Sequence, residues 1–355
     1  MTFTVFLIRL DLISSSLNCG QARGGIPNGR KDEYPTTHHN RKGQKKLKPS
    51  DAARAASVLD QRGVGMKEKR WQPWILLSPS LSAIFFFMVV PICFIIVYSF
   101  WIRASTGADI PAFQLGNYQK FFEDFFYSGM LLRTLRISLE TVLLCVVFGY
   151  IPAYFFYQTR TKFKFLLMLL LMLPFWISYI IRTLSWINIL GESGLINHIL
   201  ISSGLLSTPL DILYNETSVI LGLVQYMLPF MILNIYVSLE GIDKSLTEAA
   251  MSLGCTEWQA FREVILPLSL PGVSAGCLLV FVLSAGTYIT PLILGGPGNE
   301  MIANLIYNRV IGTLDWPFGS AISVLLIGLL GIIVFTYNKY LGINQIFKNL
   351  GGRTD

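Results

Sequence analysis

The sequence predicts an all-α integral membrane protein with about six transmembrane helices. Of its 355 residues, 53% are hydrophobic and only 14% are charged. This composition is rare in a domain with a fully solvated surface. Six apolar runs reach about 20 residues, the length that a helix needs to cross a bilayer. The runs are continuously apolar, which excludes the alternating pattern of a membrane β-barrel.

The six expected helices follow one another from residue 74 to residue 341. In chain order they are Trp74 to Phe100, Leu131 to Tyr157, Phe165 to Leu190, Ser218 to Leu239, Gly272 to Leu294 and Gly319 to Leu341. Several prolines lie inside these runs or near their ends, where neighbouring helices can satisfy the freed carbonyls. We expect kinks at Pro91, Pro152, Pro174, Pro229 and Pro291.

A basic tail precedes the first run. Residues 1–70 contain 14 of the 28 Lys and Arg residues but only 6 of the 21 Asp and Glu residues. The stretch RKGQKKLK at 41–48 permits nucleic-acid binding, but a disordered cytoplasmic segment beside an anionic membrane is favoured. Met66 is followed by an ordinary start to a membrane helix and is an alternative first residue. Residues 71–345 then form the membrane domain, and 346–355 form a short cytoplasmic tail.

Motifs for chemistry are missing from the sequence. The five cysteines and three histidines show no metal-ligand spacing. There is no G-x-x-x-x-G-K-[ST] phosphate loop and no catalytic nucleophile motif. We therefore expect a protein that is not an enzyme and holds no cofactor or metal of its own.

The distribution of Lys and Arg predicts the orientation in the membrane. Arg160, Lys162 and Lys164 lie in the connection after the second run, without an acidic residue among them. The connection from Gly191 to Thr217 has three acidic residues and no Lys or Arg. The second connection is therefore predicted to be cytoplasmic and the third to lie outside. Both termini and the polar segment 240–271 are then cytoplasmic.

The polar segment 240–271 shows the pattern of two short amphipathic helices. Ser245 and Glu248 fit an S-x-x-E capping box, and Gly254 is suited to end the first helix. Thr256 repeats the box with the glutamine three residues later, and the second helix is expected to run toward Pro267. A hairpin lying on the membrane surface is the alternative, but such a hairpin requires no particular capping or spacing.

The string Glu248-Ala249-Ala250, with Gly254 and then Leu266-Pro267, resembles the EAA signature of permease subunits of ATP-binding-cassette (ABC) importers. One position departs from it, because Val264 stands where the family usually has Ile. The resemblance implies a type I importer fold in which this segment is a coupling helix seated in a cytoplasmic ATPase. It also implies two ATPase subunits that bind ATP, a second identical or related permease, and a periplasmic or lipid-anchored binding protein.

Three further stretches resemble the spermidine/putrescine branch of these permeases. They are residues 174–197, 284–306 and 315–323, so the likeness covers most of residues 70–345 and stops before the tail. The resemblance implies import of polyamines across the inner membrane. Permeases for another small solute, such as an opine, a phosphonate or ferric iron, are the alternative. A secondary transporter working alone is less favoured, because no inverted repeat or paired intramembrane charge is evident.

Glu140 and several aromatic residues are candidates for the translocation pathway. Glu140 lies near the middle of its run, where an unpaired charge costs about 2.5–3.5 kcal/mol. It either faces a cavity suited to a cationic amine or contacts a neighbouring helix. Ring faces also attract ammonium groups, although packing and interface roles are the more frequent uses of such residues. The aromatic candidates are Trp176, Tyr179, Trp186, Tyr226 and Tyr288. Arg182 is expected near the outer interface and is not assigned to substrate.

Overall fold

The structure is a computed structural model that describes residues 72–104, 106–159 and 162–341. The chain divides into two units, Met1–Ile75 and Leu76–Asp355, and the description below concerns the second unit and the first turn of the helix that enters it. The predicted tail (1–70), the alternative start at Met66 and the C-terminal tail (346–355) lie outside the described residues.

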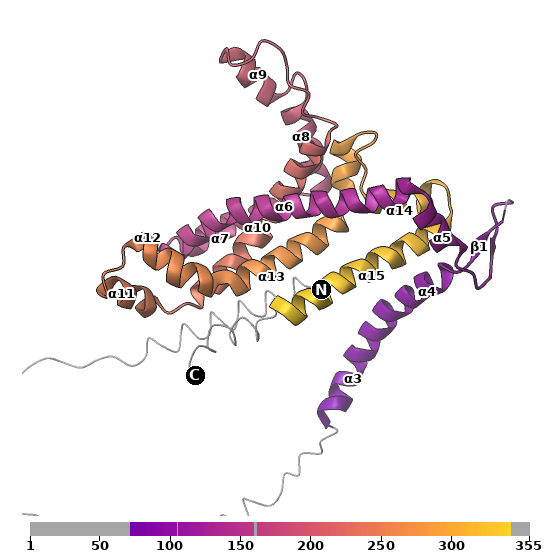
Figure 1. Cartoon of the computed structure of the whole chain (residues 1–355), viewed down its shortest axis with the longest axis horizontal. Helices are drawn as coiled ribbons and strands as arrows, with labels where there is room; N and C mark the ends of the chain where they lie inside the picture. Colours follow the sequence, from indigo (N-terminus) through magenta and orange to yellow (C-terminus); the bar gives the residue numbers. More distant parts are fainter. Residues whose placement is uncertain (1–71, 105, 160–161, 342–355) are drawn as a thin grey trace, which may run out of the picture. The chain divides into compact units, whose positions relative to one another are not determined.

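The described residues are mainly helical, as the sequence predicts (Figure 1). Five helical stretches are long and apolar enough to cross a membrane: Leu77–Tyr98, Phe125–Gln158, Glu216–Glu240, Glu257–Ala285 and Trp316–Lys339. Two further helical parts, Lys164–Trp176 and Tyr179–Ser202, pass the same test together and are bent by 89°. Counted as one broken third span, they bring the candidate spans to the expected six.

The largest core lies where three long helices pack side by side. These helices are α6 (Phe125–Gln158), α10 (Glu216–Glu240) and α13 (Leu266–Ala285), which run next to one another in Figure 1. Cys145, Met231 and Val280, one from each helix, are fully buried there. The shared core fixes α10 between its two neighbours.

The third span breaks near Pro174. Helix α7 (Lys164–Met172) passes into a 3₁₀ turn, η2 (Leu173–Trp176), and α8 (Tyr179–Leu190) then leaves in a new direction. Proline has no amide N–H and its ring clashes with the carbonyl four residues earlier, which explains the break. The kink expected at Pro174 is thus confirmed.

At two other prolines the helix is not broken, and a π-helical segment precedes each of them. The segment η1 (Phe85–Val89) ends two residues before Pro91, and η3 (Phe261–Ile265) ends two residues before Pro267. A π turn widens the helix, so it accommodates the proline ring without stopping the helix. The helix that contains the start of the predicted fifth run, Gly272 to Leu294, therefore begins earlier, at Glu257, and it ends at Ala285.

A second, smaller core joins α5 (Gly116–Glu123), the start of α6, α14 (Ile302–Tyr307) and α15 (Trp316–Leu341). The strands β1 (Ile102–Arg103) and β2 (Asp109–Ile110) make an antiparallel hairpin that precedes α5. The other elements are α9 (Leu195–Ser202), η4 (Pro291–Gly295) and η5 (Asn308–Gly312). The smaller core contains Phe121, Tyr127, Ile302, Phe318 and Ile322.

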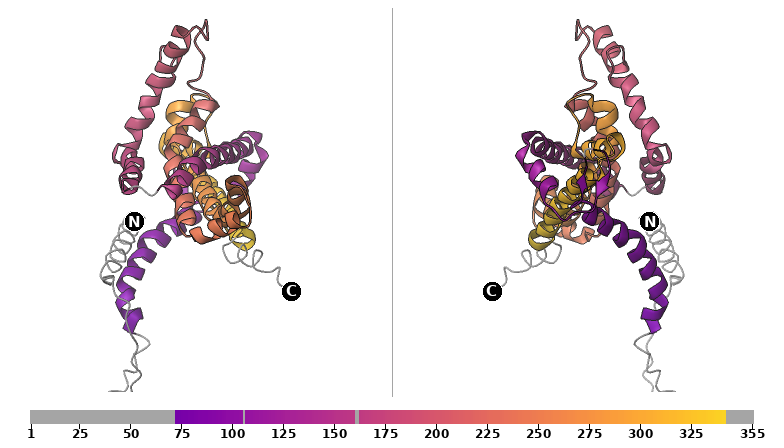
Figure 2. Two further views of the ribbon diagram at one scale, coloured as in Figure 1. Left: turned by 90° about the vertical axis from the view of Figure 1, so that its left-hand side faces the viewer. Right: turned by 90° about the vertical axis from the view of Figure 1, so that its right-hand side faces the viewer.

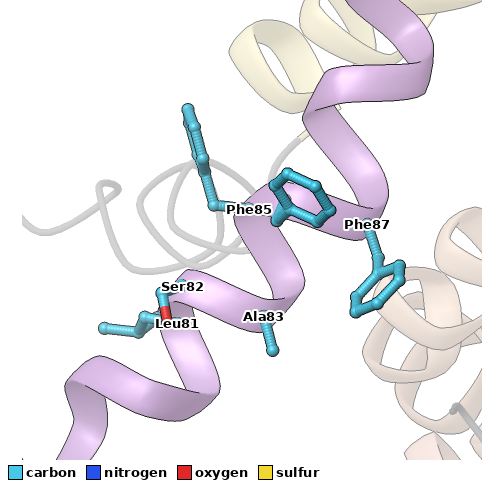
Figure 3. Close-up of a pocket in the computed structure, with 6 residues that line it drawn as sticks. Leu81, Ser82, Ala83, Phe85 and Phe87 are labelled. Carbon is cyan, nitrogen blue, oxygen red and sulfur yellow. The ribbon is translucent and has the colours of Figure 1, made fainter.

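The first span has no buried side chain along Leu77–Val97. It is formed by α3 (Gln72–Ile84), η1 and α4 (Val90–Tyr98), which continue into one another in Figure 2. A shallow hollow between Leu81 and Phe87 is lined by residues of this one span, and Phe85 and Phe87 project from it (Figure 3). Such a surface is suited to lipid or to another hydrophobic helix.

Candidate functional site: a projecting two-helix segment and an aromatic site

Two short helices form the segment that the sequence singles out. They are α11 (Lys244–Ser252) and α12 (Glu257–Ala260), and the second leads through η3 into α13. The predicted Ser245/Glu248 capping box is wrong. Asp243 is the N-cap, since its side chain accepts a hydrogen bond from the Ser245 amide at 2.9 Å. The helix begins earlier than expected because this carboxylate already satisfies a free amide.

The other two local predictions are confirmed. Thr256 and Gln259 form a reciprocal capping box at the start of α12. Gly254 follows the end of α11 with a φ of +93°, a conformation that side chains rarely adopt. The turn between the two helices therefore depends on this glycine.

The segment presents an apolar surface together with an exposed charge. Leu246, Leu253 and Trp258 are 47%, 87% and 68% exposed, and α11 buries none of its side chains. Glu248 is exposed, and among the described residues its carboxylate has no hydrogen-bond or ion-pair partner. Large exposed apolar side chains on a short projecting element mark a surface that another molecule covers.

The EAA residues fall into two groups in space. Glu248, Ala249 and Gly254 lie exposed on the projecting segment, and Ala250 is half-buried beneath them. Leu266 and Pro267 instead belong to the first turn of α13, where both are partly buried. The motif therefore combines a surface with the start of a membrane helix.

Aromatic contacts fix the segment to the bundle. The Phe261 ring centroid lies 5.8 Å from that of Tyr150, 5.0 Å from Tyr154 and 5.4 Å from Trp258. Ala260 and Ile265, on either side of Phe261 in the same continuous helix, are also buried. The ring contacts attach η3 to α6, so the exposed Trp258 of α12 stands next to a packed stretch.

Two basic side chains add connections at this end of the bundle. The Lys164 ammonium lies 2.9 Å from a carboxylate oxygen of Glu240 and 5.0 Å from the ring centroid of Tyr236. The Lys244 ammonium lies 5.3 Å from the ring centroid of Tyr157. The first contact holds the start of α7 at the end of α10, and the second holds the start of α11 at the end of α6.

Two of the predicted pathway aromatics meet beside the helix break. The ring centroids of Tyr179 and Tyr226 are 4.4 Å apart, and the Tyr179 hydroxyl hydrogen-bonds the side chain of Thr290. The ring centroids of Phe175 and Tyr226 are 5.9 Å apart. Residues of the third span, α10 and the start of η4 thus form one cluster, which we call the aromatic site.

Arg182 belongs to this aromatic site, contrary to the sequence prediction. Its guanidinium carbon lies 5.2 Å from the ring centroid of Tyr226 and 5.5 Å from that of Phe175. Tyr226 is ten residues into the 25-residue helix α10, so Arg182 reaches the middle of that helix. The expected position near the outer interface assumed a straight third span, and the 89° bend removes that assumption.

The other predicted pathway residues lie elsewhere. Trp176 is 79% exposed, and Tyr288 stacks on Tyr307 with centroids 5.1 Å apart. Glu140 forms an i,i+4 ion pair with Arg136 at 3.8 Å, and Arg136 also binds Glu216 at the start of α10. The carboxylate of Glu140 is therefore paired with a charge and does not contact the aromatic site.

A bundle of apolar helices with an exposed two-helix projection is the architecture that the resemblance to importer permeases predicts. The chain belongs to the family of binding-protein-dependent transport system inner membrane components, whose family model matches residues 64–342. Members of this family are transporter subunits, and the chain is therefore not an enzyme.

Curated relatives cover most of the chain. It is 37% identical over 265 residues to the spermidine/putrescine transport system permease protein PotB of Haemophilus influenzae, covering 75% of this chain and 92% of the relative. It is 36% identical over 251 residues to PotB of Escherichia coli K12, covering 71% and 91%. A part of 93 residues is 36% identical to PotC of the same E. coli strain, covering 26% of this chain and 35% of PotC.

A solved structure supports the same fold. The chain superposes with a TM-score of 0.61 on a subunit of a bacterial ABC transporter that imports the acidic polysaccharide alginate, covering 77% of this chain and 95% of that subunit. The sequence identity is 18%, so this likeness concerns the fold alone. The type I importer permease fold expected from the resemblance is confirmed.

Proposed function

We propose that this chain is a permease subunit of an ATP-driven importer of polyamines, with spermidine and putrescine as substrates. The observation that carries the proposal is the 37% identity to a spermidine/putrescine permease across 92% of that relative. The chain would form half of the translocation pathway.

The proposed importer has four kinds of component. A second, related permease is supported by the partial match to PotC, another permease of a spermidine/putrescine system. A cytoplasmic ATPase dimer binds the ATP, and a periplasmic or lipid-anchored protein delivers the substrate. In this arrangement residues 240–271 and both termini face the cytoplasm, as the positions of Lys and Arg favour.

Uptake of radiolabelled putrescine and spermidine tests the substrate. We expect uptake to disappear when the gene is deleted and to return when it is restored, with unlabelled polyamines as competitors. Unchanged polyamine uptake in the deletion strain would contradict the proposed substrate. Competition by an opine, a phosphonate or ferric iron, without competition by polyamines, would identify another branch of the family.

We further propose that the exposed face of α11 and α12 docks on the ATPase. Its exposed apolar residues support this assignment, as does the Glu248 carboxylate, which is unpaired among the described residues. Trp258 is the expected anchor, because buried Trp residues at the centre of an interface often contribute about 2 kcal/mol or more. Trp258→Ala should therefore weaken ATPase binding about 30-fold or more.

Co-purification of the ATPase with the permease provides the measurement. Glu248→Ala should also reduce the recovered ATPase and abolish uptake, while the permease remains in the membrane. Glu192→Ala is the matched control, because Glu192 is an exposed carboxylate in the connection between α8 and α9. Full ATPase recovery and normal uptake with Trp258→Ala and Glu248→Ala would refute the docking role.

A further inference from the structure

The position of Arg182 in the aromatic site is unusual for a charged side chain. Its guanidinium faces Tyr226, which lies about 15 Å from the start of α10, a helix that is about 37 Å long. Arginine remains protonated in proteins, so the charge persists at this depth. Among the described residues no carboxylate lies within 4.0 Å of Arg182.

Within the described part of the chain, neutral groups alone hold this guanidinium. Its Nη1 donates a hydrogen bond to the Pro174 carbonyl at 2.9 Å, and the rings of Phe175 and Tyr226 present their faces to it. The carbonyl is available because the helix is broken there, although the Ile177 amide also donates to it at 3.2 Å. Each cation–ring contact contributes about 0.5–2 kcal/mol.

These ligands do not distinguish a guanidinium from an ammonium. Ring faces attract either cation, and a carbonyl oxygen accepts hydrogen bonds from either. The bond to the Pro174 carbonyl is charge-assisted on the donor side only, whereas a carboxylate partner would add a second charge and bidentate geometry. Because the acceptor and the two rings carry no net charge, an ammonium in the same place would meet the same partners.

We propose that Pro174, Phe175 and Tyr226 form a cation subsite of the translocation pathway, and that Arg182 is a tethered occupant which a substrate ammonium displaces. This inference rests on the proposed function and adds the residues that recognise the substrate. Arg182 competes with the substrate for the subsite and thereby lowers the apparent affinity of the subsite for polyamines. The ring faces and the Pro174 carbonyl make the subsite selective for cations.

Equilibrium binding of radiolabelled spermidine to the permease–ATPase complex in nanodiscs tests the inference. The binding protein is omitted, because its own affinity would mask that of the subsite. Arg182→Gln removes the competing cation and should tighten spermidine binding by about 2- to 30-fold, the range that cation–ring contacts provide. Arg182→Lys keeps a cation on the tether and should bind as the wild type does.

Arg309→Gln is the matched control. The Arg309 guanidinium carbon lies 5.8 Å from the ring centroid of Tyr127 and 5.5 Å from that of Phe318, nearly the geometry of Arg182, but in the smaller core. Its removal should leave spermidine affinity unchanged. Phe175→Leu keeps an apolar side chain without an aromatic ring, and it should weaken spermidine binding by about 2- to 30-fold in the wild-type background.

The outcomes separate the subsite from the proposed function. Unchanged or weaker binding with a folded Arg182→Gln complex overturns the tethered-cation role, as does unchanged binding with Phe175→Leu. If Arg182→Gln does not assemble, the Phe175→Leu result decides. Loss of polyamine uptake on deletion of the gene supports the proposed function independently. If uptake is lost on deletion but spermidine binds Arg182→Gln as it binds the wild type, the proposed function stands and this inference alone is refuted.

Discussion

Substituting Gly272 with alanine is expected to force two of the central helices apart. A Cβ atom at this position would lie 2.1 Å from the Ser238 Cβ and 2.7 Å from the Asn234 carbonyl oxygen. Neither atom moves when a side chain changes its rotamer, so α10 and α13 themselves must shift. Carbon atoms pack at about 3.5–4.0 Å, and the local separation must therefore grow by about 1.5 Å.

The expected cost follows from overpacking in a close-packed core. Forcing additional methyl groups into such a core costs about 1–3 kcal/mol. With about 2–4 °C per kcal/mol for a large domain, the apparent melting temperature should fall by about 2–12 °C. Thermal unfolding of the purified permease complex in detergent, followed by tryptophan fluorescence, measures this change.

A substitution elsewhere controls for the change of residue type. A Cβ atom added to Gly328, in the apolar helix α15, would meet no neighbouring atom of the described residues within 4 Å, so Gly328→Ala should not lower the melting temperature. Combining Gly272→Ala with Ser238→Gly should recover part of the loss, because it removes the atom in closest contact. An unchanged melting temperature with Gly272→Ala would refute the close approach of α10 and α13.

Two further predictions concern the end of the bundle that carries the projecting segment. Lys164→Gln and Glu240→Gln should each lower the melting temperature by about 0–4 °C, because a partly exposed ion pair contributes about 0.2–1 kcal/mol, and the double variant should lose less than the sum. Asp243→Ala should increase hydrogen exchange in the first turn of α11. The hydrogen bond from the Ser245 amide lowers the pKa of the Asp243 carboxyl below its ordinary value of 3.8, so the cap is complete above about pH 3.8 and is lost as the pH falls through the lower folded value. Normal exchange with Asp243→Ala at pH 7 would show that the cap does not stabilise the helix.

The sequence was sufficient to predict features that depend on local pattern. Six apolar runs, the turn at Gly254 and the capping box at Thr256 each follow from residue types at short spacing. The first helix of the projecting segment shows the limit of this approach. Asp243 and Ser245 are both good N-cap residues, and the structure selects Asp243.

The features that escaped prediction depend on geometry between distant residues. Pro174 indicated a kink, but no local pattern gives the 89° bend that brings Arg182 to Tyr226. Likewise, Pro267 was expected to separate a surface helix from a membrane helix. The π-helical segment before it keeps the two continuous, and such widening depends on how the side chains pack around it.

This continuity relates the projecting segment to the aromatic site. The helix from Glu257 to Ala285 is about 42 Å long, so a tilt of about 5° about one end displaces the other by about 4 Å. Thr290, five residues beyond its end, hydrogen-bonds Tyr179 in the aromatic site. If the ATPase docks on Trp258 as proposed, one helix and a short connection link that contact to the aromatic site, without a relay of side chains. A displacement of about 4 Å exceeds the reach of a hydrogen bond, so tilting of this helix is sufficient to separate Thr290 from Tyr179, whose ring packs against Tyr226 in the aromatic site.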